Sequence, residues 1–437
     1  MPGNSFLLHI FYKYIVRVNS TGGRFFSLGL VTTVLLLTCV PAAASDYTLG
    51  IFGNANEDDT IDMQDVEYTE HIVLGLNDQT QLADAKYDGE INILDWTQIE
   101  LIMLGQEKEL TFLDDYVTGN DPNGKPITIK KPVERMIVLS TYATEAVRSL
   151  RSTDRIVGVP TYFVTDHAGF FTELVNLPTI GSGFKPDIES VIELEPDMVL
   201  AYATLPKPEE FEERLPESIT VVHLDFTRAD RMIEDFAKLG YILGKRDEAG
   251  EIADFYREFD NNINEQVGKL PDNEKPGVYI ESIWNPESKY KAIGKNTGTD
   301  KTVTMAGGEN IADFDDYKTI DAEWVITQDP DVIVAQVFTG MGCGYEHDDP
   351  SGLKAVRESI MNRPELAGVT AVKENRVYCI SIQVTTKPRY FVGVAYLTKW
   401  FHPEIFADFD TQAKHEEYLE KYQGVPYQGI YVYPALA

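Results

Sequence analysis

The sequence predicts an α/β protein in which two similar lobes are joined by one long helix and preceded by a small all-α module. Three observations lead to this prediction. Short apolar runs alternate with helical patterns over residues 126–228 and again over 271–437, as expected for parallel sheets with helices on both faces. A long amphipathic segment lies between these regions. Two acidic loops of matching pattern precede them.

The composition is that of an acidic globular protein. The chain has 437 residues, 43% of them hydrophobic, and a formal net charge of -32. It is therefore long enough for more than one domain. The charge argues against nucleic acid as a partner, because phosphate recognition requires basic surfaces.

Residues 1–45 have the features of a signal peptide. Lys13, Arg17 and Arg24 precede the apolar run 25–37, and small residues follow at 41–45, in the order of an export signal with its cleavage site. An uncleaved anchor helix is the alternative, since the apolar run approaches the roughly 20 residues that span a bilayer. Both interpretations predict an exported protein, at the extracellular face of the cytoplasmic membrane, in the periplasm or at the cell surface.

Two acidic loops within residues 46–108 carry oxygen-bearing residues at alternate positions. The first is NANEDDTIDMQD at 54–65, and a second copy begins at Asp84. An amphipathic helix is expected after each loop, at 66–75 and 96–105. A single acidic loop is usually a solvated turn, but two copies of one pattern fit twelve-residue loops that wrap calcium in oxygen ligands. The expected ligands are Asn54, Asn56, Asp58, the Thr60 carbonyl, Asp62 and Asp65 in the first loop, and Asp84, Asp88, the Glu90 carbonyl, Asn92 and Asp95 in the second.

This tandem resembles a dockerin module, an EF-hand-like pair of loop–helix calcium motifs. The resemblance implies structural Ca²⁺ and no catalytic cofactor. Lys86 departs from it by placing an ammonium group where an oxygen is expected. The positions that would face a cohesin partner carry Met63, Gln64, Ile93 and Leu94, which argues against cohesin binding and leaves another cell-surface partner open.

After a turn-rich linker at 109–125, the chain alternates between strands and helices. In the first lobe, strands are expected at 135–140, 155–159 and 219–224, with another that ends at Tyr202, and a helix at 141–150 begins at Thr141 or Thr144. In the second lobe, strands are expected at 276–282, 331–338 and 376–381.

Connecting helices are expected over 229–270, between the lobes. The apolar residues there recur at threes and fours, as on one face of a helix: Ile252, Phe255, Tyr256, Phe259, Ile263 and Val267. Two lobes joined in this way have a crevice between them, beyond the carboxyl ends of the strands.

Several segments, in order, carry a resemblance to a known family. They are RMIVLSTYATEAVRSL with RIVGV, DIESVIELEPDMVLA, AGGENIADF, YKTIDAEWVITQDPDVIVA, AVKENRVYCI and KPRYFVGVAYLTKWFHPEIF. Over roughly 125–420 the chain is similar to the substrate-binding proteins of ABC importers for ferric siderophores, haem and cobalamin. The resemblance implies two Rossmann-like lobes that capture a metal chelate and deliver it to a permease and its ATPase.

Residues at strand ends are the candidates for contact with this ligand. Aromatic rings there stack on a planar ligand, and an arginine holds a carboxylate or a charged chelate. The alternative for each residue is a place in the core or at the rim. The candidates are Thr141, Tyr142, Tyr162, Phe163, Tyr202, Trp284, Phe338, Tyr345 and Arg389.

The resemblance also implies that one glutamate on each lobe docks onto the permease. The matching positions are Glu189 and Glu323, each at the start of a helix before a Pro-Asp strand. Complementary charge of this kind speeds encounter and fixes orientation. The alternative is a first-turn glutamate that only complements the helix dipole.

Other functions have less support in the sequence. No nucleophile elbow, phosphate loop or paired acid–base motif is present, so an enzyme is not expected. A metal chelatase on the same two-lobed architecture is a distant alternative. A nearer one is a cell-surface interaction protein that works through its calcium module. If cleavage follows Ala44, Cys343 and Cys379 remain, either as one disulfide or as two buried thiols.

Overall fold

Two loop–helix segments come first in the part of the chain that the structure describes. The computed structural model describes residues 47–114, 116, 124–203 and 205–435, so the predicted signal peptide lies outside the described residues. The chain divides into two units, Met1–Gln106 and Glu107–Ala437. The first holds helices α2 (Met63–Val73) and α3 (Ile93–Leu104).

The second unit begins with an antiparallel hairpin where a linker was expected. Strand β1 (Glu109–Asp114) pairs with β2 (Lys125–Lys130). The prediction of a linker at 109–125 is therefore wrong over β1. The Asp114 carboxylate accepts hydrogen bonds from the backbone N–H of His223, 3.1 Å away, and pairs with its ring Nδ1 at 2.9 Å. These bonds tie the hairpin to the first lobe.

The first lobe is built on a four-stranded parallel sheet in the order β4-β3-β5-β6. Its strands are β3 (Met136–Val138), β4 (Ile156–Gly158), β5 (Met198–Tyr202) and β6 (Thr220–Leu224). Its helices are α4 (Thr141–Ser149), α5 (Thr161–Asp166) and α6 (Ile188–Glu193). Ile137, Val199 and Val221 pack at the core of this lobe, because every strand of a parallel sheet covered on both faces is apolar.

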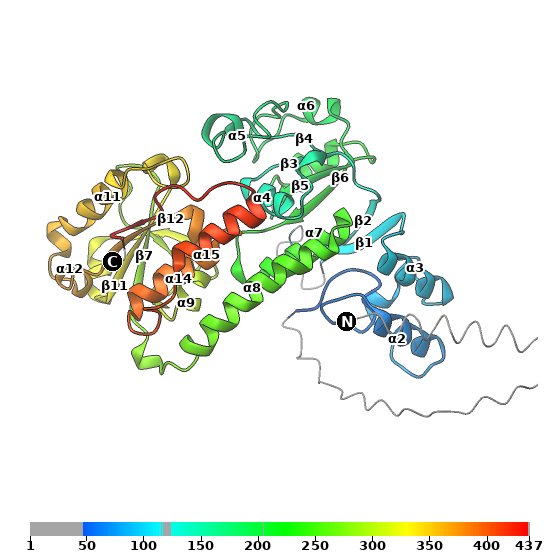
Figure 1. The fold of residues 1–437 in the computed structure, drawn as a ribbon, viewed down its shortest axis with the longest axis horizontal. Coiled ribbons are helices and arrows are strands. Elements are labelled where there is room, and N and C mark those ends of the chain that lie inside the picture. The colour runs from blue at the N-terminus through cyan, green and yellow to red at the C-terminus, as the bar shows by residue number, and fades with distance from the viewer. Residues whose placement is uncertain (1–46, 115, 117–123, 204, 436–437) are drawn as a thin grey trace, which may run out of the picture. The chain divides into compact units, whose positions relative to one another are not determined.

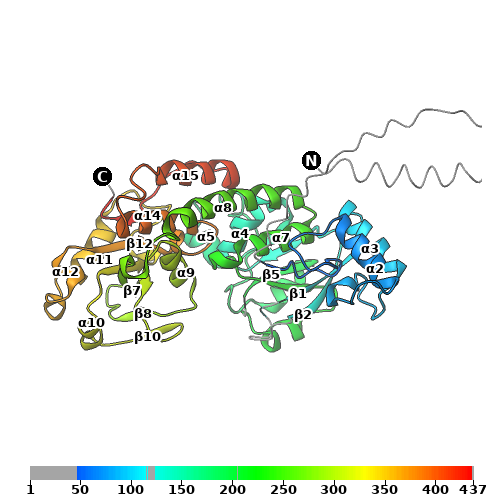
Figure 2. The same ribbon diagram turned by 90° about the horizontal axis from the view of Figure 1, so that it is seen from below.

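A long helix carries the chain to the second lobe. Helix α7 (Met232–Leu243) leads into α8 (Arg246–Val267), whose 22 residues span about 33 Å at 1.5 Å per residue. Figures 1 and 2 show α8 running from one lobe to the other. Its predicted apolar face is confirmed, since all six expected residues from Ile252 to Val267 are buried.

The second lobe has a mixed sheet in the order β10-β8-β7-β11-β12-β13, with β9 beside β7. The central strands β7, β11 and β12 are parallel, while β8, β10 and β13 are antiparallel to their neighbours. The strands are β7 (Gly277–Ile283), β8 (Lys291–Ile293), β9 (Glu309–Asn310), β10 (Tyr317–Thr319), β11 (Val332–Val337), β12 (Val377–Ser381) and β13 (Val432–Tyr433). The helices are α9 (Gly298–Met305), α10 (Ala322–Gln328), α11 (Ser351–Met361), α12 (Thr370–Lys373), α13 (Ile382–Thr385), α14 (Tyr390–Phe401) and α15 (Thr411–Tyr418).

The C-terminal segment returns to the linking helix and the first lobe. Helix α15 continues into a π-helical turn, Leu419–Gln423. The Tyr422 hydroxyl donates to the Glu251 carbonyl at 3.3 Å, and Lys421 pairs with the Glu251 carboxylate at 2.9 Å. Gln423 Nε2 also donates to the Glu145 carbonyl of α4 in the first lobe, so two segments join the lobes, α8 and the C-terminal segment.

The predicted fold class is confirmed for the two lobes and their linking helix, and each predicted strand overlaps an observed one. The predicted cap of α4 is wrong. Ser140 is the N-cap, and its hydroxyl accepts from the Ala143 N–H, while Thr141 already lies in the helix. Cys343 and Cys379 are buried free thiols rather than a disulfide. Among the described residues, no helix is long and apolar enough to cross a membrane.

Helix α14 packs so closely on α13 that only glycine fits at Gly393. A Cβ there would lie 2.1 Å from the Val384 carbonyl oxygen, whereas a Cβ at Gly250 in α8 would meet nothing within 4 Å. We expect Gly393→Ala to lower the free energy of unfolding by about 1–3 kcal/mol through overpacking. Gly250→Ala should raise it by about 0.5–1 kcal/mol through helix propensity. Chemical denaturation of both variants measures the difference, and equal effects would contradict this packing.

Candidate functional site

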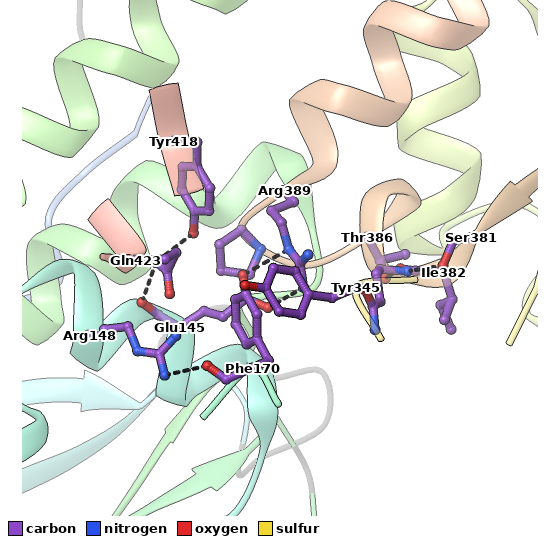
Figure 3. A network of polar contacts seen from close by, with 12 residues as sticks. Glu145, Arg148, Phe170, Tyr345, Ser381, Ile382, Thr386, Arg389, Tyr418 and Gln423 are labelled. Atoms are coloured by element: carbon purple, nitrogen blue, oxygen red, sulfur yellow. Dashed lines mark hydrogen bonds and ion pairs between the residues drawn. The ribbon is translucent and has the colours of Figure 1, made fainter. Parts of the chain in front are cut away.

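A buried ion pair joins the two lobes at the crevice. Arg389, which precedes α14 in the second lobe, donates from Nε and Nη2 to the two carboxylate oxygens of Glu145 in α4, at 3.1 and 2.9 Å. Both side chains are at least 97% buried. The guanidinium also lies 4.8 Å from the ring centroid of Phe170. Figure 3 shows Arg389 and Glu145 facing each other.

Two further segments hold the partners of this pair in place. The Tyr256 hydroxyl of α8 donates to the carbonyl of Pro388, the residue before Arg389, at 2.8 Å. On the other side, Gln423 Nε2 donates to the Glu145 carbonyl at 3.2 Å and to Ser149 Oγ at 2.8 Å. Figure 3 places Gln423 between α4 and Tyr418. The linking helix and the C-terminal segment therefore both position the pair.

The space around the ion pair is small. Side chains from both lobes line a cavity of about 10 Å³, which has room for no more than about one water. Its lining residues include Thr141, His167, Gln383 and Lys387. A drug-sized or larger ligand must therefore bind beside this cavity or separate the lobes there.

Lys387 is a second cation at the crevice. Its Nζ lies 4.5 Å from the ring centroid of Tyr142, and it forms no ion pair with any described residue. Burial lowers the pKa of Lys387 to about 8; Glu145 opposes that shift and Arg389 adds to it. The ammonium is therefore charged at neutral pH. Burial likewise lowers the pKa of His167 to about 4, so this imidazole is neutral.

An aromatic wall extends from Lys387 toward the surface of the first lobe. The Tyr142 ring lies 5.8 Å from that of Tyr202, and the Tyr202 ring lies 6.4 Å from that of Phe184. Phe184 is 63% exposed and borders an open pocket of about 630 Å³ that also has Glu189 in its lining. Burial raises the pKa of Tyr202 to about 12, so its hydroxyl stays protonated and can donate a hydrogen bond.

The structure brings five of the predicted ligand residues to this crevice. Thr141, Tyr142 and Tyr202 lie on the first lobe. Tyr345 and Arg389 come from the second, and the Tyr345 ring reaches across to Phe170 at 4.9 Å. Arg389 is present but is already neutralised by Glu145, so it is not the unpaired cation that was expected.

The other four predicted ligand residues lie elsewhere or point differently. Phe163 is 1% exposed and packs on Phe171, so its prediction as a crevice residue is wrong. Tyr162 donates its hydroxyl to the Leu139 carbonyl at 3.1 Å, beside His167. Trp284 is 59% exposed just after β7, and Phe338 follows β11. Both follow the carboxyl ends of central strands of the second lobe, so their role as ligand contacts stays a prediction.

Several crevice residues were missed in the sequence. Glu145 lies inside a helix and meets its partner 244 residues away, and no local pattern signals such a contact. Phe170, Phe184 and Gln383 were missed for the same reason. Lys387 had a usable signal, because it stands two residues before Arg389 in the segment chosen for its positive charge.

The two acidic loops of the first unit have matching geometry. In each, the last carboxylate accepts a backbone N–H from the third loop position, Asn56 to Asp65 at 3.2 Å and Lys86 to Asp95 at 3.0 Å. A capping box begins the helix that follows each loop. Burial raises the pKa of Asp65 to about 7, and the nearby Asp58 and Asp62 charges add to the shift.

The first loop has a further feature that suits a cation. The Asn54 side chain is fully buried, and its amide nitrogen donates to the Leu49 and Asp58 carbonyls. Its Oδ1 has no hydrogen-bond partner in the described chain. In the second loop, Asp84 instead accepts the N–H groups of Asp88 and Gly89. Across the described residues, no three His, Cys, Asp or Glu side chains are grouped to hold a metal ion.

Two α/β lobes, a stiff helix between them and a crevice lined from both sides define a two-lobed solute-binding protein. A family model described as periplasmic binding protein matches residues 136–383. The match covers more than half of the chain, and the chain belongs to this family. It is thus a solute-binding component of an ABC transporter.

Two relatives are similar over 60% or more of this chain. An uncharacterized ABC transporter substrate-binding lipoprotein, YvrC of Bacillus subtilis, is 24% identical over 301 residues, or 67% of this chain and 87% of its own. The cobalamin-binding protein of Halobacterium salinarum is 28% identical over 273 residues, or 60% of this chain and 69% of its own. The names of both relatives describe binding proteins.

Solved structures share the fold. The molybdate-binding protein MolA of Haemophilus influenzae aligns with a TM-score of 0.59 and 18% identity, over 73% of this chain and 99% of its own. The TroA-like protein FepB of Veillonella parvula aligns with a TM-score of 0.59 and 24% identity, over 73% and 98%. Likeness at this identity shows the fold alone.

The Glu145–Arg389 pair makes a quantitative prediction about stability. We expect Glu145→Leu and Arg389→Met each to lower the free energy of unfolding by about 3–5 kcal/mol, because each leaves one buried charge unpaired. The double variant should lower the free energy of unfolding by clearly less than the sum of the two single effects, because it leaves no buried charge unpaired. Urea denaturation of the four proteins measures the coupling.

A surface pair provides the matched control. Lys354 and Glu358 lie 3.9 Å apart with more than half of each side chain exposed. A double-mutant cycle on this pair should give a coupling free energy below about 1 kcal/mol. Additive effects of the Glu145 and Arg389 substitutions would show that the two charges do not stabilise each other.

Proposed function

We propose that this protein is the extracytoplasmic binding component of an ABC importer for a metal chelate: a ferric siderophore, haem or a corrinoid. The observation that carries the proposal is the crevice, where the Tyr142 and Tyr202 rings stand beside the Lys387 ammonium. Aromatic faces suit a planar macrocycle or catecholate, and a cation suits the carboxylate or chelate charge. A bare metal ion fits less well, since it needs several converging ligand side chains.

The linking helix supports a small closure in this function. Helix α8 is continuous over 22 residues, whereas large domain closures use a few flexible residues as hinges. The C-terminal segment adds a second connection to α4. The lobes therefore adjust around the ligand by small movements at the crevice.

Delivery to the permease is proposed to use Glu189 and Glu323. Both side chains are exposed at the start of α6 and α10. Neither takes part in an ion pair with a described residue, so both carboxylates remain available to basic groups of a partner. The permease and its ATPase then complete the importer.

Calcium is proposed for the first unit. The chemistry of the donors fits, because the buried, unpartnered Asn54 oxygen and the Asp58, Asp62 and Asp65 carboxylates belong to one loop. Asn56 and the Thr60 carbonyl would complete the first site. Asp84, Asp88, the Glu90 carbonyl, Asn92 and Asp95 would form the second. Bound Ca²⁺ offsets the repulsion among these carboxylates and so stabilises the loops.

A cell-surface interaction protein remains the second candidate function. One observation favours it: the first unit exposes large apolar side chains at the end of α2 and the start of α3, namely Leu74, Leu76, Ile93 and Leu94, each more than half exposed. Exposed apolar surface of this kind marks many protein-interaction sites.

A ligand titration tests the proposed function. Tryptophan fluorescence of the exported chain should be quenched by ferrichrome, haemin or cyanocobalamin. Lys387→Met should weaken the binding of an anionic chelate by about tenfold, the effect of about 1.4 kcal/mol. Because burial lowers the pKa of Lys387 to about 8, its charge is lost above that pH, and wild-type affinity for an anionic chelate such as haemin should fall as pH rises through 8.

Lys354→Met is the control, because it removes an exposed lysine from α11. It should change neither the affinity nor its pH dependence. If the wild-type protein bound none of the three chelates, the proposed function would be wrong.

A separate measurement tests calcium. We expect Ca²⁺ to bind the full chain in calorimetry and to raise the melting temperature of the first unit. Asp65→Asn should abolish the site in the first loop, whereas Asp78→Asn, an exposed residue between the loops, should not. Removal of calcium with EDTA should leave the affinity of the crevice for its metal-chelate ligand unchanged. A loss of that ligand binding would show that the two units depend on each other.

A further inference from the structure

The two lobes carry the same eleven-residue pattern around their predicted docking helices. Residues 187–197 read DIESVIELEPD and residues 321–331 read DAEWVITQDPD. Six positions are identical: two Asp, one Glu, one Val, one Ile and one Pro. The burial of the first seven positions is also the same in both segments. The helices are labelled α6 in Figure 1 and α10 in Figure 2.

Four of the six shared positions have structural roles. The first Asp caps the helix, since Asp187 accepts from the Ser190 N–H and Asp321 from the Trp324 N–H, both at 2.8 Å. The Val is fully buried in each lobe. The Pro is buried just before the strand.

The last Asp anchors the entry to the sheet. Asp197 accepts the Arg135 N–H at 2.8 Å, and Asp331 accepts the Gly277 N–H at 2.7 Å. Each bond holds the start of a neighbouring strand. These four positions are therefore the same in both lobes because the same local structure requires them.

The other two shared positions, a glutamate and an isoleucine, make no contact of this kind, although the glutamate lies in the first turn, where it complements the helix dipole. Glu189 and Glu323 are exposed and form no ion pair with a described residue. Ile192 is 37% exposed and Ile326 is 45% exposed. Each isoleucine lies three residues after its glutamate, so the two side chains are neighbours on one helix face.

A matched pair of exposed isoleucines is unusual. Isoleucine is among the residues most often buried, and single exposed ones need no explanation. In the described part of the second unit, only Phe184, Ile192, Trp284, Tyr317 and Ile326 are large exposed hydrophobic residues. Two of these five occupy the same position of the repeated segment, which local structure does not explain.

We propose that each lobe binds the permease through a carboxylate and an isoleucine side by side, Glu189 with Ile192 and Glu323 with Ile326. The inference rests on the proposed function and deepens it. The partner surface that fits has a Lys or Arg next to an apolar socket, and it presents this combination twice. The carboxylates orient the encounter, while burial of the isoleucines slows dissociation.

The expected effects of the two kinds of residue differ. Ile192→Ser with Ile326→Ser should weaken docking by about tenfold, from the apolar area removed from water, and should leave its salt dependence unchanged. Glu189→Ala with Glu323→Ala should weaken docking and flatten its salt dependence, because exposed charges are screened by ions. Both double variants should keep wild-type stability and chelate affinity.

The experiment uses the full chain in two assays. The first measures uptake of radiolabelled ferrichrome, haemin and cyanocobalamin, each at limiting concentration, by host cells that lack the chromosomal copy. The second measures binding to right-side-out membrane vesicles of the same host at low and high salt. The control double variant is Glu193→Ser with Thr327→Ser, which changes the next exposed position on the same helices.

The outcomes separate this inference from the proposed function. Reduced uptake and reduced vesicle binding for the isoleucine variant, with an unaffected control, support it. Wild-type uptake and binding for that variant, alongside loss for the glutamate variant, would overturn it and leave the proposed function intact. A wild-type chain that restores uptake of none of the three probes overturns both.

Discussion

The buried ion pair between Glu145 and Arg389 is the constraint on which the closed crevice depends. Two charges out of water are tolerated only when they face each other with good geometry, and here the carboxylate and guanidinium meet through two hydrogen bonds. The pair fixes the middle of α4 in the first lobe against the start of α14 in the second. The Tyr256 and Gln423 bonds transmit this restraint to α8 and to the C-terminal segment. Moving the lobes apart at this point would expose or separate both charges.

The same pair decides which cation is available to a ligand. The positive charge of Arg389 is balanced by the carboxylate of Glu145, so the pair is neutral as a unit and adds little to the attraction of an anion. Lys387 has no such partner among the described residues, and burial already lowers its pKa. An anionic group that enters the crevice therefore gains most by approaching Lys387, beside the Tyr142 ring. Two residues that look equivalent in the sequence have different roles because only one is already paired.

The sequence predicted the elements well and the contacts between them poorly. The apolar runs located the seven main strands, and the spacing of Ile252 to Val267 located the linking helix, because hydrophobic periodicity is a local property. The strand at 109–114 was read as part of a linker, since its pairing with 125–130 and the bonds between Asp114 and His223 are contacts that no local pattern signals. Phe163 was assigned to the crevice because an aromatic residue after a strand looks the same in the sequence whether it points inward or outward. Glu145 was missed because its role depends on a partner 244 residues away.

The repeated segments at 187–197 and 321–331 show how a structure can separate what a sequence pattern combines. In the sequence alone, the shared Asp, Glu, Val, Ile and Pro cannot be divided between folding and binding. The structure assigns the caps, the buried Val and the strand anchors to folding, because each has a bond or a contact that the helix-to-strand connection needs. Glu and Ile remain, exposed on the same face in both lobes. Identity at positions that folding does not require needs another physical cause, and contact with a partner that has two equivalent surfaces supplies one.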